Sequence, residues 1–163
     1  MEKLKLKYKA LRQALKILGD AIDLLGAVER RCSGSSTVSI CPDDAHTPFS
    51  CEKLFRASRD SAIQRFEYCT DLFWKYLKLF LETSGKPPSS TAPVLIVRTC
   101  GVAGFISEKQ AEQAIKMVKD RNLTSHTYWE ELAEQIVEKI PNYYVLMTEV
   151  TTSLAPEKLL NTT

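Results

Sequence analysis

Apolar residues recur at alternating steps of four and three along the first thirty residues of the chain. This spacing places them on one side of an α-helix, because an α-helix has about 3.6 residues per turn. The predicted helix runs from about Lys3 to Arg31, and it needs other helices against which to bury that side. The apolar stripe consists of Leu4, Tyr8, Leu11, Leu15, Leu18, Ile22 and Leu25.

A second long helix is predicted to begin near Ser50. Its stripe is broad and aromatic, as expected for a helix buried on a wide face. Gly85 suits its C-terminal cap, and the two prolines that follow cannot continue it. A shorter helix is predicted from Ala92 to Ala103, with a proline in its first turn.

Two more helices follow. Ser107 and Gln110 form a capping box that opens the first of them, and a polar break is expected from Asp120 to His126. The last stripe runs from about residue 129 to 154, and Pro141 inside it should kink or split that helix. No segment alternates with a two-residue period, so no strand is predicted.

These patterns predict an all-α protein, an up-and-down helical bundle of about five helices, three of them long. The chain has 163 residues, which favours one domain. We therefore expect a single helical domain over residues 1–163, with an insert loop at about 32–50 where glycine, serine, threonine and proline replace the apolar pattern.

The charge balance limits the classes of partner. Lysine and arginine number 22 and aspartate and glutamate 20, a net charge of +2. This argues against a polybasic nucleic-acid binder, but a local basic patch is compatible with it. A solvated face is favoured over an RNA-binding patch for the basic half of the first helix. No apolar leader or membrane span is evident, so a cytoplasmic protein is expected. The basic residues of that helix are Lys3, Lys5, Lys7, Lys9, Arg12 and Lys16.

The insert loop contains its own candidate site. Five cysteines without a secretory leader argue against a disulfide framework. A zinc site is an alternative, because the spacing from Cys41 to His46 to Cys51 matches half of a zinc knuckle, with Cys32 as a fourth ligand. The spacing from Cys32 to Cys41 does not fit a knuckle, so an insert with unpaired thiols is favoured and no cofactor is expected.

The segment from Asp120 to Tyr128 is the densest polar cluster of the chain, although it separates two apolar-striped helices. A connecting turn normally uses Gly, Asn or Asp. Arg121 and His126 instead suit RNA cleavage without a metal. A histidine can move the proton of the ribose 2′-hydroxyl, and a guanidinium can bind two phosphoryl oxygens. Asp120 or Glu67 is a candidate to orient them. Spacing alone favours a simpler interpretation, in which these residues cap a helix and pair with acids.

The pattern Arg121-x4-His126-x-Tyr128 resembles the signature of HEPN-domain proteins. Residues 120–128 look like the branch called nucleotidyltransferase substrate-binding proteins, and residues 63–68 and 74–78 resemble the second-helix pattern of the same branch. The resemblance covers about residues 7–154 outside the insert. The insert itself is a departure, because family members connect the first two helices more briefly.

The resemblance implies a bundle that forms a homodimer, with the signature motifs facing each other across the dimer cleft. It also implies a partner, a minimal nucleotidyltransferase. In toxin–antitoxin members of the family the HEPN chain is an endoribonuclease, which the partner silences by adding AMP to the signature tyrosine. The corresponding residues are Arg121 and His126 for cleavage and Tyr128 for modification or phosphate contact, with Asp120, Asn122 and Glu67 in supporting roles. The alternative is a non-catalytic subunit that binds a nucleotide or substrate for the transferase.

Overall fold

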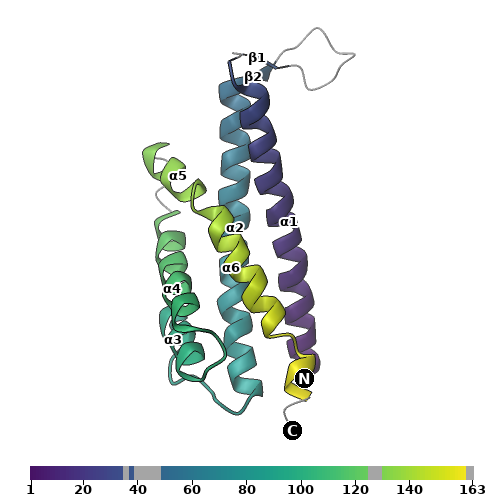
Figure 1. Cartoon of the computed structure of the whole chain (residues 1–163), viewed down its shortest axis with the longest axis vertical. Coiled ribbons are helices and arrows are strands. Elements are labelled where there is room, and N and C mark those ends of the chain that lie inside the picture. Colours follow the sequence, from purple (N-terminus) through teal and green to yellow (C-terminus); the bar gives the residue numbers. More distant parts are fainter. Residues whose placement is uncertain (35–36, 39–48, 125–129, 161–163) are drawn as a thin grey trace.

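The computed structural model describes residues 1–34, 37–38, 49–124 and 130–160. Two long helices, α1 (Glu2–Cys32) and α2 (Cys51–Thr83), lie side by side along their whole length, and the other helices cover one side of this pair (Figure 1). The further elements are β1 (Thr37–Val38), β2 (Phe49–Ser50), α3 (Pro93–Val102), α4 (Glu108–Leu123), α5 (Glu130–Val137), α6 (Ile140–Ser153) and α7 (Glu157–Leu160).

The all-α bundle is the fold that the apolar periodicity predicts. The predicted capping box is present at the start of α4, where the Ser107 hydroxyl accepts from the Gln110 backbone N–H and the Gln110 side chain accepts from the Ser107 backbone N–H. Pro141 lies in the first turn of α6, and α5 ends at Val137, so the last stripe is split as expected.

The structure differs from the predicted elements at three places. The insert contributes a two-residue antiparallel strand pair, β1 with β2, which is too short to show as alternation in the sequence. A short helix, α7, follows α6. The predicted polar break begins too early, because α4 continues through Leu123 and places Asp120 and Arg121 in its last turn.

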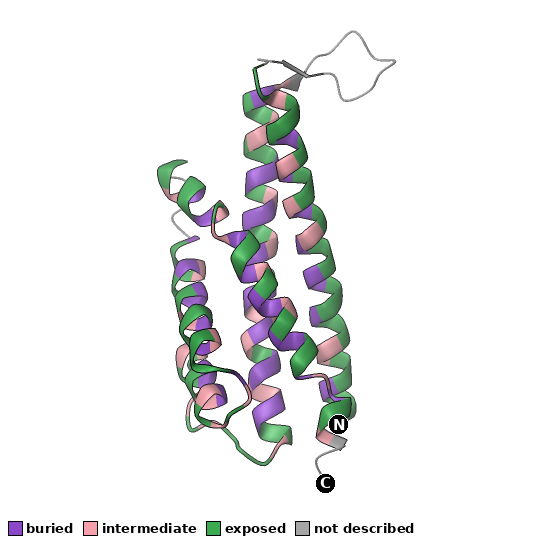
Figure 2. Ribbon diagram, viewed as in Figure 1, coloured by how far each residue is buried: buried purple, intermediate pink, exposed green. Residues whose placement is uncertain are grey.

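The core lies between the helices, where buried residues line the inner sides of α1, α2, α4 and α6 (Figure 2). Phe66 of α2 stacks on Tyr143 of α6 with ring centroids 5.6 Å apart. The hydroxyl of Tyr76, which is fully buried, donates to the backbone oxygen of Leu154. Burial raises the pKa of the Tyr76 hydroxyl, so it stays protonated and keeps this hydrogen bond. These contacts fix α6 against α2.

Helix α6 also approaches α1 closely at Gly19. A Cβ atom at this position would lie 3.0 Å from the Tyr144 hydroxyl oxygen and 3.2 Å from the ring carbon that carries it. Glycine at this position therefore leaves room for the end of the Tyr144 side chain against α1.

A disulfide joins Cys32 at the end of α1 to Cys51 at the start of α2, with the two Cα atoms 5.6 Å apart. The prediction of unpaired thiols in the insert is wrong for these two cysteines. The helical register explains the pairing, because the two residues face each other where the antiparallel helices end. A thiol in a disulfide is no zinc ligand, so two of the four proposed zinc ligands are lost. The other two, Cys41 and His46, lie outside the described residues.

No helix in the described ranges is both long and apolar enough to cross a membrane.

Candidate functional site

Arg121 lies in the last turn of α4, where a positive charge interacts favourably with the helix C-terminus. Its Nη2 donates to Oδ2 of Asp71 at 3.1 Å, and its Nε lies 3.1 Å from Oδ1, an ionic contact without hydrogen-bond geometry. The Arg121 side chain remains 31 % exposed. The carboxylate therefore fixes the guanidinium plane at the protein surface, and within the described part of the chain Nη1 has no partner.

Glu67 lies one helical turn before Asp71 on α2 and contacts the same end of α4. The Thr124 hydroxyl donates to Oε1 of Glu67, and its oxygen also lies 2.6 Å from the backbone oxygen of Arg121. Thr124 is almost fully buried. Two carboxylates one turn apart on α2 thus hold the last residues of α4, one through the guanidinium and the other through a hydroxyl.

Asp120 is directed toward α6 rather than α2. Its carboxylate accepts a hydrogen bond from the Tyr143 hydroxyl at 2.6 Å and pairs with the Lys139 ammonium at 3.1 Å. Burial, reinforced by this carboxylate, raises the pKa of the Tyr143 hydroxyl, which keeps it a donor. Asp120 therefore anchors α4 to α6, and we find Asp71, rather than Asp120 or Glu67, paired with Arg121.

The fold thus brings Arg121, Glu67 and Asp120 to the C-terminal end of α4, while Asn122 lies exposed on the same turn. His126 and Tyr128 lie outside the described residues. Asp71 is the site residue that sequence reasoning missed. Its spacing of four residues from Glu67 was the available signal, because residues four apart share one helix face.

A hollow of about 420 Å³ adjoins this site along α2. Beside it, Arg59 of α2 is almost fully buried. Its guanidinium contacts Asp60 at 3.0 and 3.1 Å and donates to Glu130 of α5, so it fixes the start of α5. The residues that line the hollow are Ala57, Asp60, Ser61, Ile63, Gln64 and Glu67.

Among the described residues no group of three or more His, Cys, Asp and Glu side chains is arranged to hold a metal ion. The end of α4 therefore offers a fixed cation, the Arg121 guanidinium, beside the carboxylates of Asp71 and Glu67. A guanidinium held in one plane and open to solvent is a binding group for phosphate oxygens.

Residues 6–156 match the family described as nucleotidyltransferase substrate binding protein like. The chain belongs to this family. A Thermus thermophilus protein of known crystal structure is 32 % identical to this family member, over 82 % of this chain and 98 % of that chain, with a TM-score of 0.57. No curated protein sequence matches.

Two further solved structures share the fold of this family member. One is a tri-AMPylated HEPN toxin from Shewanella oneidensis in complex with its MNT antitoxin, at 14 % identity and a TM-score of 0.58, over 88 % of this chain and 95 % of that one. The other is a toxin–antitoxin with AMP-PNP, at 14 % identity and a TM-score of 0.54, over 85 % and 98 %. The fold is that of HEPN proteins.

Proposed function

We propose that this chain, a single helical domain of residues 1–163, is the HEPN-type partner of a minimal nucleotidyltransferase in a cytoplasmic toxin–antitoxin-like pair. We further propose that it is a metal-independent endoribonuclease that uses Arg121, His126 and Tyr128. Family membership supports the partner, and the fold shared with a HEPN toxin supports the pair. The observation that carries the proposed chemistry is the position of the Arg121 guanidinium. Asp71 holds it at the surface, and its Nη1 has no partner among the described residues.

In the proposed reaction the ribose 2′-oxygen attacks the adjacent phosphorus, and the bond from phosphorus to the 5′-oxygen breaks. His126 accepts the 2′-hydroxyl proton and, once protonated, donates a proton to the leaving 5′-oxygen, which leaves a 2′,3′-cyclic phosphate. Arg121 binds the non-bridging oxygens, on which negative charge grows in the transition state. Asp71 acts as a positioning residue, because it holds the guanidinium plane before the RNA binds.

The proposal includes a homodimer in which the two motifs face each other, and it includes a way to silence the site. The nucleotidyltransferase would transfer AMP from ATP to the Tyr128 phenolic oxygen, releasing pyrophosphate. The adenylyl phosphate would then lie beside Arg121 and His126 and exclude the RNA phosphate from them. Mass spectrometry of the chain after incubation with its transferase and ATP tests this, and an unmodified Tyr128 would contradict it.

Cleavage is tested with purified chain, RNA and an excess of chelator. Wild type should degrade the RNA, while Arg121→Ala and His126→Ala should lose most of the activity, by about 100-fold or more for each catalytic group. The matched controls are Arg98→Ala, an exposed arginine on α3, and His46→Ala, the other histidine of the chain. Both controls should cleave like wild type. Equal cleavage by wild type and His126→Ala, or none by wild type, would refute the nuclease proposal.

A second candidate function is a non-catalytic subunit that binds a nucleotide or substrate for the transferase. The Asp71–Arg121 pair favours it in one respect, because a guanidinium held in place binds phosphate whether or not cleavage follows. This candidate predicts that wild type binds nucleotide or transferase and Arg121→Ala binds it less well, with no RNA turnover by either.

A further inference from the structure

Four basic residues form a row along one face of α1, here called the basic row: Lys5, Lys9, Arg12 and Lys16. Their spacing of four, three and four residues places them on one side of the helix, where successive side chains are neighbours. All four are exposed. At a rise of about 1.5 Å per residue the row is about 16 Å long.

The basic row lacks acidic partners in the part of the chain that the structure describes. Lys5, Lys9 and Lys16 form no ion pair there, and Arg12 donates to the neutral hydroxyl of Thr152 on α6 at 3.1 Å. One turn beyond Lys16 the next position on this face is the acidic residue Asp20, so the basic row stops at Lys16. By contrast, the cations Arg59, Arg121 and Lys139 are all paired with carboxylates.

Neighbouring like charges on a helix face repel each other, and a polyanion removes this repulsion while it releases its own counterions. No aromatic side chain belongs to the row, so it offers charge without a surface on which bases stack. A ligand held in this way is bound through its phosphates and without regard to sequence.

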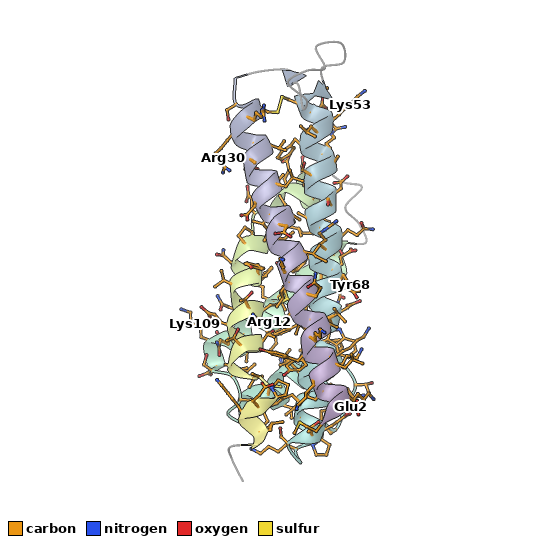
Figure 3. The ribbon with its side chains drawn as sticks, turned by 90° about the vertical axis from the view of Figure 1, so that its right-hand side faces the viewer. Glu2, Arg12, Arg30, Lys53, Tyr68 and Lys109 are labelled. Carbon is orange, nitrogen blue, oxygen red and sulfur yellow. A yellow bond between two sulfur atoms is a disulfide. The ribbon has the colours of Figure 1, made fainter. Side chains whose placement is uncertain are left out.

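The basic row reaches the level of Arg121 along the bundle. Arg12 lies twenty residues before Cys32, and Asp71 lies twenty residues after Cys51, the cysteine bonded to Cys32. Because both helices rise equally per residue from that disulfide, Arg12 lies level with the carboxylate that holds Arg121. Figure 3 shows Arg12 on the side of α1 next to α6, and Figure 1 shows α6 running obliquely from the α5 end of the bundle to the start of α1.

We propose that the basic row is a docking surface for the phosphate backbone of RNA, separate from the Arg121 site. The inference rests on the proposed function only in taking RNA, rather than another polyanion, as the ligand. Four cations on a single strand predict that log Kd changes with log salt concentration with a slope of about 0.7 per contact, or nearly 3 in all. Between about 50 and 200 mM salt the affinity contributed by the row should fall about 50-fold.

The test uses the full chain carrying His126→Ala, so that the probe is not consumed. Binding of a fluorescein-labelled oligouridylate is followed by fluorescence anisotropy over a range of salt concentrations. One variant carries Lys5→Gln, Lys9→Gln, Arg12→Gln and Lys16→Gln. The control has the same charge change at exposed positions elsewhere, namely Lys53→Gln, Arg98→Gln, Lys109→Gln and Lys116→Gln. Glutamine preserves helix propensity, and melting temperatures confirm that both variants fold.

The row variant should bind at least tenfold more weakly than the control at low salt, with a salt slope smaller by about 3. Equal affinity and slope in the two variants would overturn the proposal. The proposal would also be overturned if the row variant lost its binding to anionic phospholipid vesicles but bound RNA as before. The basic row would then be a docking surface for a membrane. The two proposals fail separately. Arg121→Ala abolishes cleavage and lowers the salt slope by at most about 0.7, the share of one phosphate contact. The row variant in a chain with wild-type His126 raises KM and leaves kcat unchanged.

Discussion

Arg121 of α4 and Asp71 of α2, fifty residues apart in the chain, meet through two nitrogen–oxygen contacts of 3.1 Å. The carboxylate has two opposing effects on a guanidinium that binds phosphate. It fixes the orientation of the side chain, which favours catalysis, and it adds a negative charge beside the incoming phosphate, which weakens binding.

Replacing Asp71 separates these two effects. In Asp71→Asn the affinity for a small phosphate ligand such as 5′-AMP should rise about fivefold, because removing one like charge at this partly exposed site is worth about 1 kcal/mol. RNA cleavage should slow at the same time, since the guanidinium is less well oriented. Isothermal titration with chelator and a cleavage assay measure both. Asp23→Asn, an exposed carboxylate of α1, is the control. Weaker AMP binding by Asp71→Asn would contradict the proposed role of the Asp71–Arg121 pair.

The buried contact of Asp120 with Tyr143 makes a prediction about stability. Asp120→Ala leaves the Tyr143 hydroxyl and the Lys139 ammonium without their acceptor, so the free energy of unfolding should fall by about 2–3 kcal/mol. Tyr143→Phe keeps the stack on Phe66 and should lose only about 1 kcal/mol. Urea unfolding of both single variants and the double variant gives the coupling energy. Additive losses would mean that the two side chains act independently.

The two buried thiols, Cys69 and Cys100, predict a loss of stability at alkaline pH. Burial raises the pKa of each thiol to about 12, whereas the ordinary value is 9.0. As the pH rises, the unfolded chain therefore loses these thiol protons before the folded chain does. The thiols do not change the free energy of unfolding below about pH 9, and they lower it as the pH rises from there towards 12. The slope is at most about 1.4 kcal/mol per pH unit for each thiol. Unfolding of Cys69→Ala with Cys100→Ala should show a shallower decline, and an unchanged decline would exclude the thiols as its source.

The disulfide predicts a stability that depends on redox conditions. The Cys32–Cys51 bond closes a loop with a sequence separation of 19, for which about 3 kcal/mol of stabilisation is expected. It lies at the end of the α1–α2 pair, where a small apolar cluster of Ala21, Leu25 and Ala62, with Phe55 and Val137 packed against it, supports the helices. Dithiothreitol should lower the melting temperature of wild type. A Cys32→Ser, Cys51→Ser variant should start at the lower value and not respond, and a response in that variant would point to another cysteine.

Helical periodicity was enough to predict the bundle, because each stripe reports which side of its own helix is buried. Local chemistry was enough for the Ser107 capping box and for the break at Pro141. Contacts between helices were not predictable in this way. The spacing within α4 cannot show that Arg121 meets Asp71 of α2 while its neighbour Asp120 meets Tyr143 of α6.

The cysteines show the same limit. Their odd number favoured free thiols, whereas the pairing of Cys32 with Cys51 depends on where two antiparallel helices end. The proposed roles of His126 and Tyr128 stay predictions from the motif and the family.

The close approach at Gly19 links two distant parts of the bundle. A methyl group there would lie 3.0 Å from the Tyr144 hydroxyl oxygen, so the end of the Tyr144 side chain on α6 would have to move. That same helix carries Tyr143, whose hydroxyl holds Asp120 next to Arg121. The absence of a side chain at position 19 thus leaves room for Tyr144, the neighbour of the residue that holds Asp120 in place.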